Sequence, residues 1–276
     1  MTQLLQGEGA DALTQRTIDD FGEQWTTYTD NEGHYASVDY FFDIVLPLLT
    51  PQEVEGVSVV DVGSGSGRIV LMLLAAGAAH VHGVEPSAAF EVLQANTAAH
   101  AQRVTCHNLR GDQVPAGLGA DIAISLGVVH HIPEPASTVA AMRAALKPGG
   151  KCVLWLYGHE GNELYLAIFD PLRAVTKRLP HPLLKGLCQM LTAGASAYGA
   201  VAQKVPLPLH GYFREVFNKM DWRARYLIAY DQLNPAYAKY YRKDEARRLL
   251  EDAGFTDVQL HHRHGYSWLV SGTNPG

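Results

Sequence analysis

The stretch that decides the fold of this chain reads Val59-Val60-Asp61-Val62-Gly63-Ser64-Gly65-Ser66-Gly67-Arg68. Val57 to Val62 has the length and β-branched content of a strand buried on both faces, and the apolar run Ile69 to Leu74 continues as a helix packed on it. Glycine at alternate positions permits a sharp turn and a close approach of the backbone to a ligand, because no Cβ is in the way. The stretch therefore predicts a strand, a cofactor-binding turn and the start of a helix.

The spacing of the glycines distinguishes this turn from a dinucleotide fingerprint. Such a fingerprint reads G-x-G-x-x-G and directs a helix N-terminus at a pyrophosphate. Here Gly63, Gly65 and Gly67 give G-x-G-x-G instead. Asp61 stands two residues before the first glycine, where its carboxylate would repel a pyrophosphate and suits a ligand with an ammonium group.

Two further acids follow predicted strands. The strand that begins at His80 ends in Glu85, whose carboxylate can accept hydrogen bonds from both hydroxyls of a ribose. The next strand is followed by Asp112, whose carboxylate can accept a hydrogen bond from the exocyclic amine of adenine. A nucleoside with an amino-acid tail and no phosphate fits these acids together with Asp61.

Five motifs in this order resemble those of class I S-adenosylmethionine (SAM)-dependent methyltransferases. They are Asp61 to Arg68, Glu85-Pro86-Ser87, Gly111-Asp112, Ala120 to Ile132, and Leu146-Lys147-Pro148-Gly149-Gly150. The resemblance implies that SAM is the cofactor. The expected cofactor contacts are Asp61, Gly63, Ser64, Gly65, Gly67, Arg68, Glu85, Pro86, Asp112, Ser125, Leu126 and His130.

The pattern between residues 57 and 158 alternates strand and helix, which indicates a parallel sheet with helices on both faces. The predicted strands are 57–62, 80–85, 103–108, 120–126 and 151–157, and the predicted helices are 67–77, 87–100 and 136–146. By resemblance, a helix at 242–255 and two antiparallel strands complete an α/β, Rossmann-like, seven-stranded and mostly parallel sheet.

We expect the chain to have three parts. Residues 1–50 form an N-terminal arm and helical lid, residues 51–158 and 242–276 form the SAM-binding core, and residues 159–241 form a helical cap or substrate insertion.

Aromatic residues gather in the N-terminal part. The resemblance implies that this part closes over cofactor and substrate, so Trp25, Tyr28 and Tyr35 are candidate substrate contacts. In the alternative interpretation, Phe21 and Trp25 are four residues apart only because they dock an amphipathic helix on the core.

The segment after the fourth strand supplies the candidate base. In the family it passes beside the methionine part of SAM, and His131 is the first candidate for a general base because imidazole titrates near neutral pH. In the alternative, His130 or His131 only packs on adenine or caps the following helix. The hydroxyl of Tyr165 is a second catalytic candidate.

The insertion is the part expected to select the substrate. Glu160 and Asn162 follow the fifth strand closely, and the later half is rich in tyrosine, including Tyr230. These three residues are candidate substrate contacts. The tyrosines suit a polar-aromatic pocket or a contact in a homodimer, and the alternative is that each simply packs on the core.

Composition sets bounds on partners and location. The net charge of −6 and pI near 6.1 give no broad cationic footprint, so we expect no nucleic acid and no membrane as partners. The three cysteines show no C-x-x-C pairing, the N-terminus lacks a signal-peptide pattern, and a cytoplasmic location is expected. In His261 to His264 only His262 and His264 share a strand face, and two ligands do not make a metal site, so none is expected.

These features predict methyl transfer to a small-molecule acceptor, such as a natural product or a sugar-like or amino-acid-like compound, by direct displacement at the sulfonium methyl. An alternative is a SAM-using enzyme that cyclises or cleaves the aminobutyryl chain and releases methylthioadenosine. A protein that only binds SAM is a third option.

Overall fold

A computed structural model describes residues 9–176, 179, 181–233 and 237–276. Residues 1–8 of the expected N-terminal arm lie outside the described residues. The chain divides into two compact units, Met1–Gly161 with Tyr237–Gly276, here called the core unit, and Asn162–Ala236, here called the insertion unit. The first unit thus includes the expected lid, and the second begins and ends within the expected cap.

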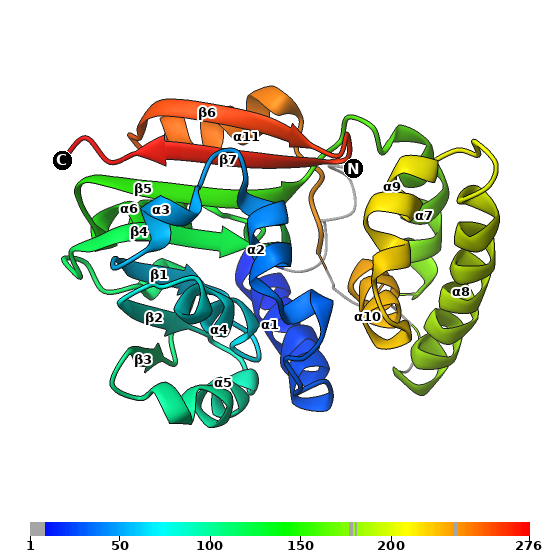
Figure 1. Cartoon of the computed structure of the whole chain (residues 1–276), viewed down its shortest axis with the longest axis horizontal. Helices are drawn as coiled ribbons and strands as arrows, with labels where there is room; N and C mark the ends of the chain where they lie inside the picture. The colour runs from blue at the N-terminus through cyan, green and yellow to red at the C-terminus, as the bar shows by residue number, and fades with distance from the viewer. Residues whose placement is uncertain (1–8, 177–178, 180, 234–236) are drawn as a thin grey trace. The chain divides into compact units, whose positions relative to one another are not determined.

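The core unit is built on a seven-stranded sheet in the order β3-β2-β1-β4-β5-β7-β6 (Figure 1). The strands are β1 (Ser58–Val62), β2 (His80–Val84), β3 (Val104–His107), β4 (Ala120–Leu126), β5 (Leu146–Tyr157), β6 (Thr256–Arg263) and β7 (Ser267–Thr273). The first five run parallel, and β7 pairs antiparallel with both β5 and β6. The predicted Rossmann-like, mostly parallel sheet is confirmed.

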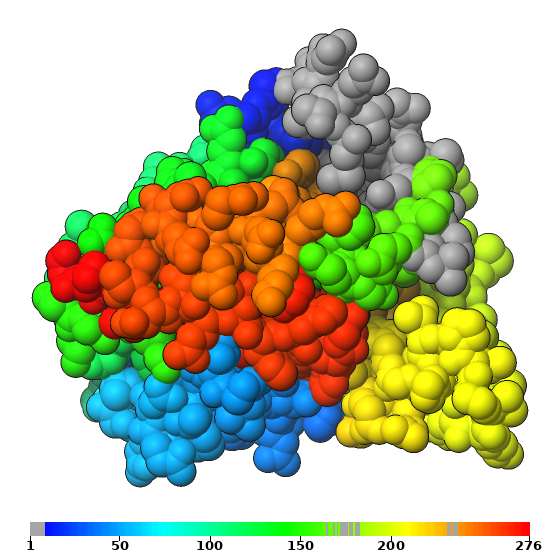
Figure 2. Space-filling model, turned by 90° about the horizontal axis from the view of Figure 1, so that it is seen from above, coloured from blue at the N-terminus to red at the C-terminus, as the bar shows by residue number. Residues whose placement is uncertain are grey.

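Helices cover both faces of this sheet. They are α1 (Ala10–Thr27), α2 (Val38–Val45), α3 (Pro51–Val54), α4 (Arg68–Ala75), α5 (Ala89–Thr97), α6 (Ala136–Ala145) and α11 (Lys243–Glu251). Short 3-10 turns add η1 (His34–Ala36), η2 (Ala98–His100), η3 (Gly111–Gln113) and η4 (Val129–His131). Figure 2 looks onto the side where α11 and β6 lie together, in orange and orange-red.

Strand β1 shows why the central strands are apolar throughout. Val59 packs into a core with residues of α2 and α4, while Val60 and Val62 pack into a second core with residues of α6 and α11. Successive side chains of a strand point to opposite faces, so a strand between two helical layers needs apolar residues at nearly every position. Asp61 is the exception in β1, and its position at the carboxyl end of the strand places it in the candidate site.

One strand differs from the sequence-based expectation. Strand β5 begins at Leu146, which pairs with Ala120, and a register shift follows before Ile122 pairs with Lys151. Residues 147–150 therefore belong to an irregular first part of a longer strand that the pattern of apolar residues revealed only from 151. Between β3 and β4 the chain forms only the short turn η3, and no helix was predicted there.

The insertion unit is helical in its described residues. It contains α7 (Glu163–Thr176), α8 (His181–Ala202), α9 (His210–Glu215), η5 (Phe217–Lys219) and α10 (Trp222–Leu233). Phe213 and Phe217 pack with Ala202 of α8 in a small core of its own. The guanidinium of Arg225 donates hydrogen bonds to the carbonyls of Phe217, Asn218 and Met220, so one half-buried cation holds the turn before α10.

Candidate cofactor and acceptor site

Asp61 lies at the carboxyl end of β1 and is 1% exposed. Among the described residues, its Oδ2 atom has no hydrogen-bond partner. Burial raises the pKa of this carboxyl to about 7, and the nearby Glu85 adds to the rise, while Ser64 and the charge of Arg68 oppose it. A buried carboxylate oxygen without a partner is costly, and an ammonium group of a ligand would supply the missing hydrogen bond and charge.

The glycine turn leaves no space for side chains. Gly63 has a φ of 84°, and a Cβ there would lie 2.4 Å from a methyl of Val128. Gly65 has a φ of 53°, and its Cβ would lie 3.2 Å from the indole nitrogen of Trp25. Both the backbone conformation and the close neighbours therefore require glycine, which accounts for the alternate glycines in the sequence.

Glu85 follows β2 and fixes the same turn from the other side. Its Oε2 accepts a hydrogen bond of 2.8 Å from the backbone N–H of Gly65, and its Oε1 accepts one of 2.9 Å from that of Ser87. The side chain is 5% exposed. A carboxylate has about four lone-pair positions, so two remain for the hydroxyls of a ribose.

The remaining expected cofactor residues fall into two groups. Ser64 and Gly67 belong to the turn after β1, where Ser64 Oγ donates to the carbonyl of Asp61 at 3.0 Å, and Ser125 Oγ of β4 donates to the carbonyl of Val62 at 2.9 Å. Leu126 at the end of β4 and Pro86 after β2 are half-buried. Asp112 instead holds the guanidinium of Arg110 in a two-point contact of 3.1 and 3.2 Å, so a role toward adenine stays a prediction.

The N-terminal segment is tied directly to the glycine turn. Asn31 donates to the carbonyl of Ser66 at 2.9 Å and accepts from its hydroxyl at 2.8 Å. Asn96 of α5 donates to the same carbonyl and to that of Thr29, both at 2.8 Å. Trp25 is half-buried against Gly65 of the turn, and the half-buried Tyr28 ends α1. A lid and the roles of these residues at the substrate stay predictions.

Arg68 and Tyr35 connect the start of α4 to η1. The guanidinium lies 3.9 Å from the centre of the Tyr35 ring and donates a hydrogen bond of 2.9 Å to its carbonyl. This pairing occupies one face of the tyrosine ring with a cation of the core.

His131 lies in η4, just beyond β4, and is 3% exposed. Its Nδ1 is 2.8 Å from the carbonyl oxygen of Tyr237, which can only accept, so Nδ1 carries the proton and the lone pair is on Nε2. The ring contacts Phe21 of α1 at 4.8 Å and Tyr157 of β5 at 5.6 Å between ring centres. This arrangement has the form of an oriented general base.

His130 has a different environment. It stacks on Tyr157 with ring centres 3.7 Å apart, and it is completely buried. Burial, followed by the neighbouring His131, lowers the pKa of His130 well below its usual value. The ring is therefore neutral and acts as a packing surface.

The segment 237–241 crosses the carboxyl ends of β4 and β5, and we call it the strap. Its Lys239 N–H donates to the carbonyl of His130 at 2.8 Å. Tyr241 pairs with Gly158, donating to the carbonyl of Tyr157 and accepting from the N–H of His159, both at 2.8 Å. The strap holds η4 in place and supplies the acceptor that orients His131.

Glu160 is engaged within the core unit. Its carboxylate accepts from the backbone N–H of Lys243 at 3.0 Å and from the indole N–H of Trp268 at 3.0 Å. One oxygen thus holds the start of α11 and the other holds β7, and these contacts give no support for the predicted role of Glu160 at the substrate.

One histidine of β6 packs on a neighbouring ring. His262 stacks on Trp268, with ring centres 4.3 Å apart. Within the described residues no group of three or more possible ligands could hold a metal ion.

Three of the expected substrate and catalytic residues belong to the insertion unit. Tyr165 stacks on Phe169 of the same helix, with ring centres 4.2 Å apart. Tyr230 is 1% exposed and stacks on Tyr226 at 5.9 Å, inside its own unit. Asn162 is half-buried at the first position of the unit. Their roles at the substrate stay predictions.

Sequence reasoning missed the residues that connect distant parts of the site. Asn31 and Asn96 were detectable only as polar residues near a turn and on a helix, and their shared partner is a backbone carbonyl. Tyr157 and Tyr237 act through a ring face and a carbonyl group. Such roles leave no motif, because any residue supplies a carbonyl.

Comparison with known proteins matches this geometry. Residues 60–152 match the model of a methyltransferase domain. The tRNA U34 carboxymethyltransferase of Shewanella halifaxensis is 32% identical over 129 residues, which are 45% of this chain and 38% of that protein. The ubiquinone biosynthesis O-methyltransferase of Aromatoleum aromaticum is 34% identical over 99 residues, 35% of this chain and 42% of that protein. The chain thus spans about two fifths of the length of these curated relatives.

Among solved structures, the 1,6-didemethyltoxoflavin-N1-methyltransferase of Burkholderia thailandensis, with bound S-adenosylhomocysteine, shares the fold. Its TM-score is 0.53 at 14% identity, over 96% of this chain and 88% of that one. Residues 60–152 are thus a methyltransferase domain, and the fold is shared with a methyltransferase that binds S-adenosylhomocysteine, the product left by SAM. The predicted enzyme class and cofactor are confirmed.

The expected exclusion of nucleic acid was wrong. Several curated relatives are named as tRNA carboxymethyltransferases, so the domain type is compatible with an RNA substrate. The physical reason is that net charge averages over the chain. Residues 162–236 contain nine Lys and Arg against five Asp and Glu, which is a net charge of +4. The rest of the chain therefore has a net charge of −10, and the total is −6.

None of the helices in the described ranges has both the length and the apolar character needed to span a bilayer.

Proposed function

We propose that the protein transfers the methyl group of SAM to a hydroxyl oxygen of a small-molecule acceptor, with His131 as the general base. The observation that carries this proposal is the hydrogen bond from His131 Nδ1 to the carbonyl of Tyr237, which leaves the basic Nε2 as the second nitrogen of the ring. An amine acceptor needs only to arrive unprotonated, whereas a hydroxyl must lose its proton as it reacts. An oriented base therefore supports an oxygen acceptor.

The residues around Asp61 fit SAM. Asp61 would hold the ammonium of its amino-acid tail, Glu85 the ribose hydroxyls, and the glycine turn would let the backbone approach. Bound there, SAM supplies a methyl group that its sulfonium already makes electrophilic. The protein has to align the acceptor oxygen with that methyl and to exclude water.

His131 has the active role in this scheme. As the acceptor oxygen attacks the methyl carbon and the carbon–sulfur bond breaks, Nε2 takes the hydroxyl proton. The Tyr237 carbonyl accepts from Nδ1 throughout and stabilises the imidazolium that forms. The rings of Phe21 and Tyr157 restrict the space around His131, which favours a small acceptor with an apolar face. The similarity to an O-methyltransferase of ubiquinone biosynthesis supports the same choice.

A tRNA acceptor is the second candidate. It is favoured by the 32% identity to tRNA U34 carboxymethyltransferase over 129 residues of the matched region. In that case the transferred group would be a carboxymethyl group and the acceptor would be U34 of a tRNA, as the name of that relative states.

The acceptor that supports turnover and the nucleoside product together separate these proposals. The purified protein is incubated with SAM alone, with a panel of phenols and other small hydroxyl compounds, and with bulk tRNA, and products are identified by mass spectrometry. S-adenosylhomocysteine formed with a small hydroxyl compound supports the proposal, whereas turnover with tRNA alone supports the second candidate. Methylthioadenosine formed from SAM alone would instead show cyclisation or cleavage of the aminobutyryl chain. A cytoplasmic location stays a prediction, which cell fractionation tests.

A further inference from the structure

The outer face of α8 in the insertion unit has an unusual composition. Leu183, Met190, Ala197 and Val201 are spaced by seven, seven and four residues, so they share one face of the helix, and all are exposed. Leu183 is 62% and Met190 69% exposed. The opposite face, which includes Leu184, Cys188 and Ala202, is buried within the unit.

Exposed apolar side chains concentrate in this unit. Among the described residues, seven large hydrophobic side chains are strongly exposed, and only Leu46 lies in the core unit. The other six are Leu183, Met190, Val201, Val205, Leu209 and Trp222. Scattered exposed apolar residues are ordinary, but their concentration on one small unit marks a contact surface.

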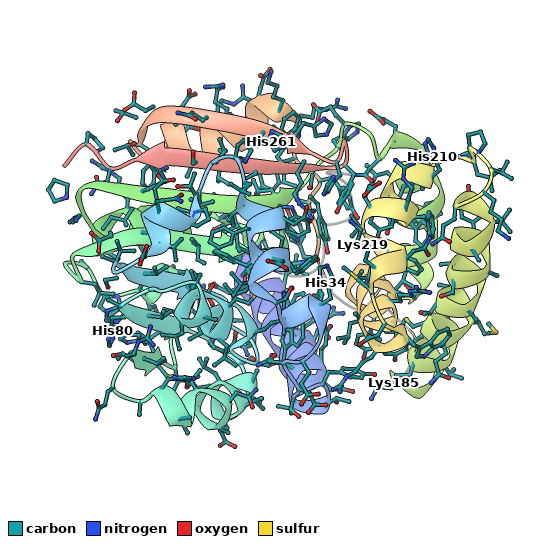
Figure 3. The ribbon with its side chains drawn as sticks, viewed as in Figure 1. His34, His80, Lys185, His210, Lys219 and His261 are labelled. Atoms are coloured by element: carbon teal, nitrogen blue, oxygen red, sulfur yellow. The ribbon has the colours of Figure 1, made fainter. Side chains whose placement is uncertain are left out.

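The same unit carries the positive charge of the chain. Residues 162–236 have a net charge of +4 against −10 for the rest of the protein. Helix α8 contains a single charged residue, Lys185, and no acid. Figure 3 shows Lys185 on α8, His210 at the start of α9 and Lys219 in η5. A strong charge asymmetry between parts of a chain indicates a charged macromolecular partner or an anionic membrane.

We propose that the insertion unit docks on a membrane surface that contains anionic phospholipids, with the outer face of α8 in the headgroup region. A helix face without charged side chains, on a unit of net positive charge, suits an interfacial helix, and Trp222 is a residue type that favours that depth. Charge complementarity selects this occupant. A second copy would bring one cationic unit against another, and the phosphates of a nucleic acid would leave Leu183 and Met190 facing charged groups.

The test is co-sedimentation of the full chain with vesicles of phosphatidylglycerol and phosphatidylcholine in equal parts. We expect binding that weakens as sodium chloride is raised, and little binding to vesicles of phosphatidylcholine alone. The double variant Leu183→Glu/Met190→Glu should bind the anionic vesicles at least about tenfold more weakly, because it removes apolar contact and adds repulsion. Gln189→Glu is the matched control, since it adds an acid at another exposed position of α8 and should bind within about twofold of the wild type.

Three results would overturn the proposal. The first is equal binding of the double variant and the wild type to anionic vesicles, with both proteins folded by circular dichroism. The second is a wild-type dimer in light scattering that the double variant dissociates, because a second copy would then cover the face. The third is an absence of vesicle binding together with tRNA binding that the double variant loses. Each measurement uses the protein without SAM or acceptor, so its outcome is independent of the methyl-transfer proposal.

Discussion

The backbone N–H of Gly65 donates a 2.8 Å hydrogen bond to Oε2 of Glu85, so the glycine turn after β1 and the acid after β2 form one rigid unit. The bond joins residues twenty positions apart in the chain. The conformation of the glycine turn therefore depends on the side chain that we propose for the ribose hydroxyls.

Replacement of Glu85 by Gln tests this coupling. The amide supplies one acceptor oxygen where the carboxylate supplies two, so either Gly65 or Ser87 loses its acceptor. We expect the Kd for SAM to rise at least tenfold and the free energy of unfolding to fall by about 1–3 kcal/mol. Calorimetric titration and thermal unfolding measure the two effects. Glu91→Gln, at an exposed position of α5, is the control, and an unchanged Kd in Glu85→Gln would refute the assignment.

Asp61 should make SAM binding dependent on pH. Its pKa is raised to about 7 by burial, and an ammonium partner would lower it, so binding requires loss of a proton below that pH. The Kd for SAM should rise as pH falls from about 8 to 6, approaching tenfold per pH unit. The Asp61→Asn variant should bind SAM weakly at every pH, and its Kd should not change with pH. The control is Asp121→Asn, which breaks an ion pair with Lys147 at the start of β4, and its Kd for SAM should depend on pH as in the wild type.

The same carboxyl should affect the stability of the ligand-free protein in the opposite direction. A folded-state pKa above the unfolded value means that the folded chain holds its proton more tightly, so stability falls as pH rises from about 4 to about 7. Asp61→Asn removes this penalty. At pH 8 without SAM, we expect its Tm to exceed that of the wild type by at least about 2 °C. A lower Tm would show that Asp61 serves the fold.

His131→Asn should separate chemistry from binding. The amide cannot take a proton at neutral pH, so kcat should fall by about 10²–10⁴ while the Kd for SAM changes less than about threefold. His100→Asn, at an exposed position of η2, is the matched control. Equal losses in kcat and SAM affinity would indicate that the ring is needed only for packing.

Asn31→Ala should loosen the N-terminal segment. It removes two hydrogen bonds to Ser66, each worth about 1 kcal/mol, so the KM for SAM should rise about five- to tenfold. Limited proteolysis near residues 28–33 should become faster, and SAM should protect the wild type more than the variant. Glu32→Ala, at the exposed neighbouring position, should behave as the wild type. Unchanged proteolysis would show that the segment is held elsewhere.

The mostly parallel sheet and the positions of Asp61 and Glu85 at the carboxyl ends of its strands were predictable because they depend on local patterns. A buried strand that ends in Asp61 or Glu85 is visible in the run of valines before it, and parallel strands bring their carboxyl ends to one edge. The start of β5 was not predictable, because Lys147 to Gly150 separate Leu146 from the apolar run that follows.

Site residues that depend on tertiary contacts were less predictable. Glu160 looked like a substrate contact from its place after β5, but its two oxygens bind Lys243 and Trp268, which follow in the sequence by more than 80 residues. The orienting contact of His131 comes from a carbonyl 106 positions away. Spacing along the chain carries no signal for such pairs.

The strap has a consequence for how this protein can change over generations. The chain leaves the core unit after Gly161 and returns to it at Tyr237, and just inside these points Gly158 and Tyr241 are paired as neighbouring backbone segments. An insertion whose two ends meet can be lengthened, shortened or exchanged without altering the connectivity of the sheet. Residues 162–236 are thus open to replacement, while the strap and its contact with His131 stay with the core unit.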